Sequence, residues 1–471
     1  MAGLKAVDKN VLWHPFTQQW EWEKNIHETP LVIARGNGNY IYDSSGRKYL
    51  DGVSSLWANL HGHNHPSINR ALIRQIKKIS HSTFLGLTHE PGIRLAQALV
   101  KIAPIGLTRV FYSDNGSTAV EVALKMAFQY HVQKPGNGNM RPEFLALRNS
   151  YHGDTIGAVS VGGIDLFHKK FKPLLFKTHF AMSPHCFRCP YNRDKSERSV
   201  FYRYGGEKPK PGDFREATGC RWECLGEAEK ILKAKSKRIS AAILEPVVQG
   251  AGGILVMPPG YLWGFAALCR RYQVLLIADE VATGFGRTGK IFACGHEGVC
   301  PDLLCLAKGI SGGYLPLAAT LATEKIYKAF LGKYDEFKAF FHGHTYTANP
   351  LACAAGLASL KLLKRKIHEG LIEKSIEALK KCLSRLSGSS RVGHVRQAGL
   401  MAGIEIVKDR KKNLSFLPGE RAGKRICMKL RSSGILLRPL GDVLVVLPPL
   451  SITPREIDFM GREILRRSHE I

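Results

Sequence analysis

The sequence predicts an α/β protein with a mainly parallel central sheet in a large domain and a smaller α+β domain built from both ends of the chain. Two observations lead to this prediction. Short, nearly continuous apolar runs alternate with helical stretches in the middle of the chain, as expected for parallel strands buried on both faces. Both ends instead mix helical stretches with isolated strands. The expected parts are 1–85 and 346–471 for the small domain and 86–345 for the large domain.

Five apolar runs mark the strands of the predicted central sheet. They lie at 109–112, 144–147, 241–244, 274–278 and 303–306. A helix is expected after the first run, because apolar residues recur with helical spacing from Val120 to Phe128. Thr118 and Glu121 fit a capping box at the start of this helix.

The two ends of the chain carry the pattern of the smaller domain. Residues 40–42 and 48–50 flank the turn residues 43–46, which predicts a hairpin. A long helical stretch is expected from about Asn349. Strands are expected later, at 403–407 and 444–447. Because neither end alone carries enough elements for a core, we expect the two ends to form one domain.

The 471-residue chain is strongly basic. Lysine and arginine number 68 against 39 acidic residues, which gives a formal net charge of +29. Such a surplus attracts anions, so a nucleic-acid-binding protein is a remote alternative. The basic residues are dispersed, however, and they do not alternate with aromatic residues as a platform for stacked bases would. We therefore expect a basic solvated surface, with neither nucleic acid nor a membrane as partner.

The sequence carries no pattern typical of secreted or membrane proteins. The first ten residues lack the apolar core of a signal peptide, and no run of 18 or more apolar residues is present. Eleven cysteines in a chain of this length do not indicate a disulfide scaffold. A cytoplasmic protein is therefore expected.

Two charged side chains follow predicted strands in the middle of the chain. Asp279 comes directly after the run 274–278, and Lys308 follows the run 303–306. Ligands of α/β sheets bind beyond the carboxyl ends of the strands, so these side chains are expected to share a site. A lysine can form a Schiff base, and a carboxylate can keep a pyridine nitrogen protonated. The pair therefore indicates pyridoxal 5′-phosphate (PLP), although a lone lysine after a strand is more often a surface residue.

The turn after the strand 109–112 places small residues at the start of a helix. Gly116 and Ser117 lie in this turn, and a helix N-terminus with small residues binds phosphate through its free backbone N–H groups. An ordinary connection between a strand and a helix has a similar composition. Both interpretations stay open at this level.

Longer motifs resemble those of one enzyme family. Residues 277–289, followed by 306–309, are similar to the signature of class III (ω-type) aminotransferases. Further similar motifs follow in the family's order along nearly the whole chain, at 112–121, 151–154, 245–249 and 344–350. The resemblance implies an aminotransferase with the type I fold of PLP-dependent transferases. It also implies a homodimer in which both subunits contribute to each active site.

The resemblance assigns roles to individual residues. Lys308 is expected to hold PLP as a Schiff base and to move a proton, and Asp279 is expected to pair with the pyridine nitrogen. Tyr151 and Val281 would lie on the two faces of the ring. The expected catalytic residues are Lys308, Tyr151 and Asp279. The expected cofactor-binding residues are Gly116, Ser117, Tyr151, Asp279, Val281, Lys308 and Thr345, of which Thr345 would reach the neighbouring subunit's phosphate.

Other segments resemble one branch of the family. Residues 12–18, 51–57 and 437–441 are similar to the branch that aminates 8-amino-7-oxononanoate (KAPA) to 7,8-diaminononanoate (DAPA) in biotin biosynthesis. KAPA has an apolar chain and a terminal carboxylate, which suit aromatic residues and an arginine. The substrate-binding residues expected on this basis are Phe16, Trp57, Gly343 and Arg438. The alternative for Arg438 is a structural salt bridge, for example with Glu245.

Two departures from this branch concern the amino donor. Phe16 stands where the branch often has tyrosine, and Val445 replaces a tyrosine common near the C-terminal strand. Both changes remove hydroxyl groups expected near the substrate amine. S-adenosylmethionine is favoured as the donor, with lysine as the alternative. The nearest rival function is another class III transaminase that acts on ornithine, 4-aminobutyrate or another ω-amine.

Residues 183–226 fit the predicted large domain poorly, because they contain few periodic apolar positions and many Pro, Gly, Arg and Cys residues. A structureless loop of this length is uncommon in a compact domain without some staple. Two close cysteine pairs have a spacing that suits a structural zinc or iron–sulfur site, with free thiols or disulfides as the alternatives. The four cysteines are Cys186, Cys189, Cys220 and Cys224.

Overall fold

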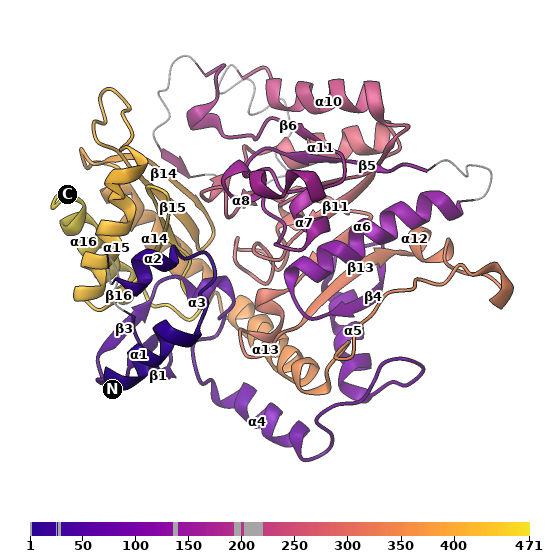
Figure 1. The fold of residues 1–471 in the computed structure, drawn as a ribbon, viewed down its shortest axis with the longest axis horizontal. Helices are drawn as coiled ribbons and strands as arrows, with labels where there is room; N and C mark the ends of the chain where they lie inside the picture. The colour runs from indigo at the N-terminus through magenta and orange to yellow at the C-terminus, as the bar shows by residue number, and fades with distance from the viewer. Residues whose placement is uncertain (1, 25, 27–29, 135–139, 193–198, 202–219) are drawn as a thin grey trace.

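The computed structural model is built around a seven-stranded, mainly parallel sheet (Figure 1). Its strands, in spatial order, are β4 (Leu107–Ser113), β13 (Ala318–Thr323), β12 (Leu303–Leu306), β11 (Leu275–Asp279), β8 (Ile239–Leu244), β5 (Glu143–Leu147) and β6 (Thr178–Ala181). The strands from β12 to β6 are parallel to one another, whereas β13 is antiparallel to both its neighbours. The predicted α/β class is thus confirmed. The structure describes all residues except 1, 25, 27–29, 135–139, 193–198 and 202–219.

The apolar runs form the central strands because these are covered on both faces. Every residue of β11 and of β12 is buried. Helix α6 (Gly116–Gln133) packs against β8, β12 and β13. Helices α10 (Glu223–Lys235) and α11 (Tyr261–Arg271) pack against each other and against β6 and β11, respectively.

Helix α6 begins at Gly116, and its cap differs from the predicted one. The side-chain oxygen of Asn115 accepts the N–H of Thr118 (3.1 Å), and the Thr118 hydroxyl accepts the N–H of Asn115 (3.1 Å). The predicted capping box of Thr118 and Glu121 is therefore wrong. Asn115 is the N-cap residue of α6. Glu121 instead accepts the N–H of Gly157 (2.7 Å).

A second sheet joins the two ends of the chain. It contains β1 (Ile33–Asn37), β2 (Tyr40–Asp43), β3 (Lys48–Asp51) and β16 (Ile435–Leu436). Strands β2 and β3 form the predicted hairpin, and β16 pairs in parallel with β3, with Ile435 opposite Leu50. Figure 1 accordingly shows the N-terminal strands among the C-terminal elements. The exact domain boundaries stay a prediction.

The third large sheet comes chiefly from the C-terminal part. Its strands are β17 (Arg438–Leu440), β18 (Val443–Val446), β15 (Met401–Ile406), β14 (Val392–Ala398) and β7 (Ser199–Phe201). They pair antiparallel, except that β7 is parallel to β14. Because β7 belongs to the cysteine-containing segment, that segment reaches the C-terminal sheet. A small separate pair is formed by β9 (Val248–Gln249) and β10 (Leu255–Val256).

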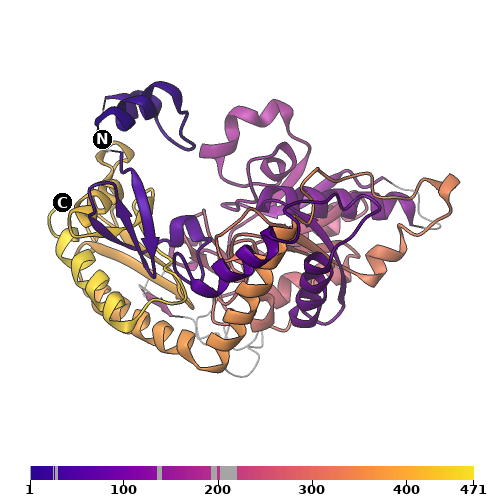
Figure 2. The same cartoon turned by 90° about the horizontal axis from the view of Figure 1, so that it is seen from below.

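The remaining helices surround these sheets. They are α1 (Ala2–Val11), α2 (Gln19–Glu23), α3 (Ser54–Trp57), α4 (Pro66–Ile76), α5 (Glu90–Ile102), α7 (Ile156–Ser160), α8 (Asp165–His168), α12 (Glu324–Lys328), α13 (Pro350–His368), α14 (Leu371–Leu386), α15 (Ala422–Ser432) and α16 (Pro454–Ser468). Short 3₁₀ helices are η1 (Lys169–Leu174), η2 (Cys186–Arg188), η3 (Ala293–His296), η4 (Lys308–Ser311), η5 (Tyr334–Glu336) and η6 (Pro418–Glu420). In Figure 2 the N-terminal helices α1 and α2 stand apart from the sheets.

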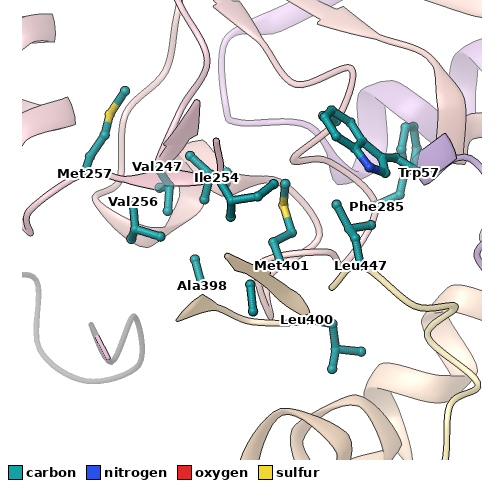
Figure 3. Packing of buried hydrophobic residues seen from close by; sticks show 14 of the residues in the cluster. Trp57, Val247, Ile254, Val256, Met257, Phe285, Ala398, Leu400, Met401 and Leu447 are labelled. Carbon is teal, nitrogen blue, oxygen red and sulfur yellow. The ribbon is translucent and has the colours of Figure 1, made fainter. Parts of the chain in front are cut away.

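One apolar core connects the sheets. Figure 3 shows part of it, from Val256 and Ile254 through Met401 to Leu447, with Trp57 at one end of the group. Trp57 is buried as part of this core and also lines the cavity described below. The wall of that cavity is therefore continuous with the core.

Arg396 on β14 is one of the two largest side chains in the core and is only 2% exposed. Its Nη1 donates to Glu405 Oε2 (2.9 Å), and its Nε donates to the carbonyls of Gly253 and Ile254 (2.9 Å each). Arg188 of η2 donates to the other oxygen of Glu405 (2.9 Å). These bonds tie the cysteine-containing segment and the loop before β10 to the C-terminal sheet.

Replacing Arg396 by methionine is expected to lower the free energy of unfolding by about 3 kcal/mol, because it leaves Glu405 Oε2 and two buried carbonyls without their donor. This is the lower end of the usual range, since Arg188 still pairs with Glu405. The matched control is Arg385→Met, which removes the exposed pair with Asp458 and should cost less than about 1 kcal/mol. Urea unfolding midpoints measure both, and equal shifts would contradict the assignment.

Candidate active site

A cavity of about 590 Å³ lies where the large sheet meets segments from both ends of the chain. The structure brings most of the sequence-predicted site residues into its lining. These are Phe16, Trp57, Gly116, Ser117, Tyr151, Asp279, Val281, Lys308 and Arg438. Gly343 and Thr345 are instead exposed and do not belong to the lining.

Asp279 and Lys308 meet because they follow adjacent parallel strands. Asp279 is the last residue of β11 and lies opposite Cys305 of β12, and Lys308 begins η4 just after β12. Lys308 has a φ of 42°, in the left-handed region. Such a conformation costs an L-residue roughly 1–2 kcal/mol, which is typical of backbone strain at functional sites.

The Asp279 carboxylate is 4% exposed and has two hydrogen-bond donors. His152 Nδ1 donates to Oδ2 (2.7 Å), and the N–H of Val281 donates to Oδ1 (3.0 Å). The other ring nitrogen of His152 is buried without a hydrogen bond among the described residues. His152 fixes the carboxylate, and this role was not predicted from the sequence. The signal available was its place beside Tyr151 in the motif 151–154.

Lys308 carries an amine in an environment that disfavours its charged form. Burial lowers the pKa of Lys308, whereas the nearby carboxylates of Asp279 and Glu245 act in the opposite direction. The buried guanidinium of Arg287 adds to the lowering. Lys308 Nζ also lies 4.8 Å from the centre of the Trp57 ring. A lysine with a lowered pKa can serve as a base near neutral pH.

Glu245 is a second buried carboxyl group beside this pair. Its oxygens accept the N–H groups of Tyr151 (3.1 Å) and Gly250 (2.7 Å). Burial raises the pKa of Glu245 to about 7. Glu245 was expected within the motif 245–249 and as a possible salt-bridge partner of Arg438, but among the described residues its oxygens accept hydrogen bonds from backbone N–H groups only. The alternative of a Glu245–Arg438 salt bridge therefore finds no support.

The N-terminus of α6 forms a tight cradle at the cavity. A Cβ atom at Gly116 would lie 2.7 Å from Val281 Cγ1, so only glycine fits beside Val281. Gly153, with a φ of 130°, lies against Ser117, whose hydroxyl accepts the N–H of Asp154 (3.1 Å). Small residues at the start of an 18-residue helix suit a bound phosphate.

Tyr151 is held in place by its own hydroxyl group, which donates to Asp154 Oδ2 (2.7 Å). Burial raises the pKa of Tyr151, with further contributions from Asp154. The ring therefore stays neutral and presents a flat surface to the cavity. At the cavity's mouth, Phe16 meets Phe167 of α8 edge to face, with ring centres 5.3 Å apart. Phe167 was not predicted from the sequence.

Trp57 is presented by an unusual backbone turn. Ser54, Ser55, Leu56 and Trp57 all have positive φ values, of 51°, 46°, 70° and 72°. The turn is left-handed and closes through Trp57 N–H to Val53 O (2.8 Å) and Ala58 N–H to Ser54 O (3.1 Å). Each such residue costs roughly 1–2 kcal/mol, so the turn must be held by its surroundings. Arg287, for example, donates from Nη2 to the Trp57 carbonyl (3.1 Å).

These features fit PLP. The cavity supplies one lysine amine, a buried carboxylate whose described partners include no lysine or arginine, and a helix N-terminus where a Cβ would clash. A cationic pyridine nitrogen would balance the charge of Asp279, and a phosphate would suit the cradle.

The four cysteines of the segment 183–226 do not form a recognisable metal site. Within the part of the chain that the structure describes, no group of three or more His, Cys, Asp or Glu side chains is arranged to hold a metal ion. Of the four, Cys224 is buried and the others are partly buried. Among the described residues, no helix is both long and apolar enough to cross a membrane.

The chain is similar to known aminotransferases over nearly its whole length. The family model described as aminotransferase class-III matches residues 22–466. The adenosylmethionine-8-amino-7-oxononanoate aminotransferase of Geobacter sulfurreducens is 48% identical, with 99% of this chain and 98% of that protein covered. The enzyme of the same name from Nitratidesulfovibrio vulgaris is 50% identical, over 97% of this chain and 80% of that protein.

Solved structures agree with this similarity. The crystal structure of adenosylmethionine-8-amino-7-oxononanoate aminotransferase from Methanocaldococcus jannaschii has a TM-score of 0.89 and 42% identity, with 100% of this chain and 99% of that chain covered. A PLP-bound amine transaminase from an uncultivated Pseudomonas species has a TM-score of 0.86 and 35% identity, over 98% of both chains.

Proposed function

This chain belongs to the class III aminotransferases, and on this premise we propose that it aminates KAPA to DAPA in biotin biosynthesis, with S-adenosylmethionine as the amino donor. The observation that carries the proposal is the identity of 48–50% with two relatives of that name over nearly the whole chain. The chain is a PLP-dependent transaminase with the type I fold. The substrates are the proposed part.

Each PLP contact is assigned to a residue of the cavity. Lys308 would hold PLP covalently, Asp279 would pair with its pyridine nitrogen, and Tyr151 and Val281 would enclose its ring. Gly116 and Ser117 would bind its phosphate through backbone N–H groups and the serine hydroxyl. When bound, PLP supplies an electron sink for the bonds at the substrate's amine-bearing carbon.

Lys308 carries out the proton transfers. Burial lowers the pKa of Lys308, which favours the neutral amine that can accept a proton. Its Nζ takes the proton from the Cα atom of the donor, and in the second half-reaction it returns a proton to the carbon of KAPA that receives the amino group. Asp279, oriented by His152, would pair with the pyridine nitrogen of bound PLP and favour its protonated form. The donor leaves as the matching keto acid before KAPA enters.

The remaining lining suits the shape of KAPA. Trp57 and Phe16 provide apolar walls for the carbon chain, and Arg438 of the same lining can receive its carboxylate. Phe16 and Val445 offer no hydroxyl group to a donor amine, so the donor is recognised by other groups. Lysine is the alternative donor.

Arg438→Leu is expected to raise the KM for KAPA about tenfold and to change kcat less, because an exposed charge-assisted hydrogen bond contributes near the lower end of roughly 1.5–3 kcal/mol. Steady-state kinetics measure this split. The methyl ester of KAPA serves as a matched substrate. Because it lacks the carboxylate, its KM should be the same for the wild type and for Arg438→Leu. Arg462→Leu, an exposed arginine outside the cavity, should leave KM unchanged.

The proposed function is tested by the visible absorption of the bound cofactor. DAPA should bleach the band, and KAPA should restore it. Added to fresh enzyme, S-adenosylmethionine should bleach it while lysine does not, and the reverse result would make lysine the donor. Bleaching only with ornithine or 4-aminobutyrate would reject the KAPA assignment and retain the transaminase.

A homodimer with shared active sites is part of the proposal. Gly343 and Thr345 lie outside the cavity of their own chain, on an exposed segment that also carries Phe341 and Tyr346. We assign Thr345 to the phosphate site of the neighbouring subunit and Gly343 to its substrate site. Mixing a Lys308→Ala subunit with a Thr345→Asp subunit should restore part of the activity, because the hybrid contains one intact site. A cytoplasmic location completes the proposal, and cell fractionation tests it.

A structural zinc ion at Cys186, Cys189, Cys220 and Cys224 stays a prediction from their spacing. Metal analysis of the purified protein tests it: about one zinc per chain, lost in a Cys186→Ser variant, would support the site, and a metal-free protein would remove it.

A further inference from the structure

Asp51 is a buried carboxylate that does not touch the cavity. It lies at the end of β3, is 1% exposed and is absent from the cavity lining. Its oxygens accept the N–H of Ser55 (2.9 Å) and the hydroxyl of Ser55 (2.8 Å). Ser55 is the second residue of the left-handed turn that ends at Trp57. Asp51 therefore holds the turn from its N-terminal side.

His63 fixes Asp51 in this position. His63 Nε2 bonds to Asp51 Oδ2 (2.9 Å), and the backbone of His63 pairs with Gly38 through two hydrogen bonds (2.7 and 3.1 Å). A Cβ atom at Gly36 would lie 2.6 Å from His63 Cβ, so the histidine is packed directly on β1. Hydrogen bonds from His63 and Ser55 outweigh burial and lower the pKa of Asp51, which keeps it ionised. The turn is thus anchored to the N-terminal hairpin.

The turn determines where the indole of Trp57 lies. The indole packs on Gly250, where a Cβ atom would lie 3.0 Å from Trp57 Cζ3, and it faces Lys308 Nζ. On the other side of the turn, the hydroxyl of Ser54 donates to the carbonyl of Leu447 (2.7 Å), which lies in the same core as Trp57 (Figure 3). Without its anchors, the left-handed backbone would relax toward ordinary φ values and withdraw the indole from the cavity.

We propose that Asp51 is a positioning residue that acts through the left-handed turn 54–57, seats Trp57 against the amine of Lys308, and so sets how tightly the site holds the apolar chain of its substrate. This inference deepens the proposed function, on which it rests for the identity of the substrate. Asp51 acts only through Trp57, since it touches neither the reacting groups nor the cavity.

The test begins with Asp51→Ala and the milder Asp51→Asn, assayed with KAPA. In Asp51→Ala the indole of Trp57 should be misplaced, which is expected to lower kcat/KM by about 10–10²-fold, mostly through a higher KM. Asp51→Asn keeps one acceptor oxygen, so its kcat/KM should fall less. The matched control is Asp43→Ala. Asp43 also accepts the N–H (2.9 Å) and the hydroxyl (2.6 Å) of a serine two residues on, but in a turn away from the cavity. Asp43→Ala should therefore leave kcat/KM unchanged.

Two further variants separate positioning from a general loss of structure. Ser55→Gly added to Asp51→Ala should recover about fivefold in kcat/KM, because glycine adopts positive φ without the steric cost. In a Trp57→Ala background, Asp51→Ala should lower kcat/KM little further, because the indole that Asp51 positions is absent. Additive losses, or no recovery with Ser55→Gly, would overturn the inference. If Asp51→Ala does not fold, the same comparisons are made with Asp51→Asn.

Failure of the proposed function gives a different result. A wild-type protein that is inactive on KAPA but bleached by another amine would reject the substrate assignment. The single and double variants of Asp51 and Trp57 are then assayed with that amine. Whether their losses of kcat/KM are additive still decides the role of Asp51.

Discussion

Lys308→Ala is expected to lower kcat by roughly 10⁴-fold, because the variant loses the amine that we propose both attaches PLP and moves the substrate's proton. Lys308 is the only lysine in the cavity lining formed by the described residues, so no nearby amine can replace it. The fold should persist, since removing a buried amine leaves no unpaired charge. Single-turnover assays measure the loss, and borohydride reduction followed by mass spectrometry should find the cofactor attached to the wild type only.

Lys366 provides a matched control for this prediction. It is also buried, and burial lowers its pKa to about 8, but it lies on α13 outside the cavity. Lys366→Met should keep normal kcat and normal covalent attachment. Attachment that persisted in Lys308→Ala, or was lost in Lys366→Met, would show that the wrong lysine has been assigned.

Asp279→Asn is expected to lower kcat by about 10²–10³-fold, because it keeps the shape of the side chain and removes the charge that we propose stabilises the protonated pyridine nitrogen. The hydrogen bond from His152 would also change, since an amide has only one acceptor oxygen. Bound cofactor should be lost more readily on dilution, which absorption measures directly.

The control for Asp279 is an aspartate on the same sheet. Asp302 lies just before β12, accepts the N–H of Leu276 of β11 (2.9 Å) and is outside the cavity. Asp302→Asn should affect stability slightly and kcat hardly at all. Equal losses of kcat in the two variants would mean that Asp279 matters because it stabilises the sheet, and not because it contacts the cofactor.

The sequence predicted the parts of the fold that depend on apolar patterning. Strands β5, β8, β11 and β12 are uniformly buried, so their apolar runs were visible in the sequence. Asp279 and Lys308, at or after the ends of two of these strands, line the same cavity, as the sequence predicted. Strand β13 was missed because its Ala and Thr residues give little contrast with a loop. Strand β14 was missed because its buried positions include Arg396, whose polar groups are satisfied only by distant residues.

The missed site residues share a physical reason. His152 and Glu245 act through hydrogen bonds to groups that are far away along the chain, and Phe167 reaches the cavity only through folding. The turn at Trp57 was hidden as well, because none of its four residues is glycine, the residue that normally indicates positive φ. Local sequence indicates only the backbone conformation that a segment prefers by itself, whereas tertiary contacts impose these conformations.

The parallel pairing of β3 with β16 also bears on how the chain is made. Leu50 leaves the ribosome long before its partner Ile435, which lies several hundred residues later in the chain. Until then β3 has an unpaired edge, and the segments that carry Trp57 and Arg438 cannot be brought together. Contacts between such distant segments slow folding, so the nascent chain should depend on chaperones until β16 has been synthesised. A translation product that stops before β16 would therefore be an aggregation-prone fragment with an incomplete site.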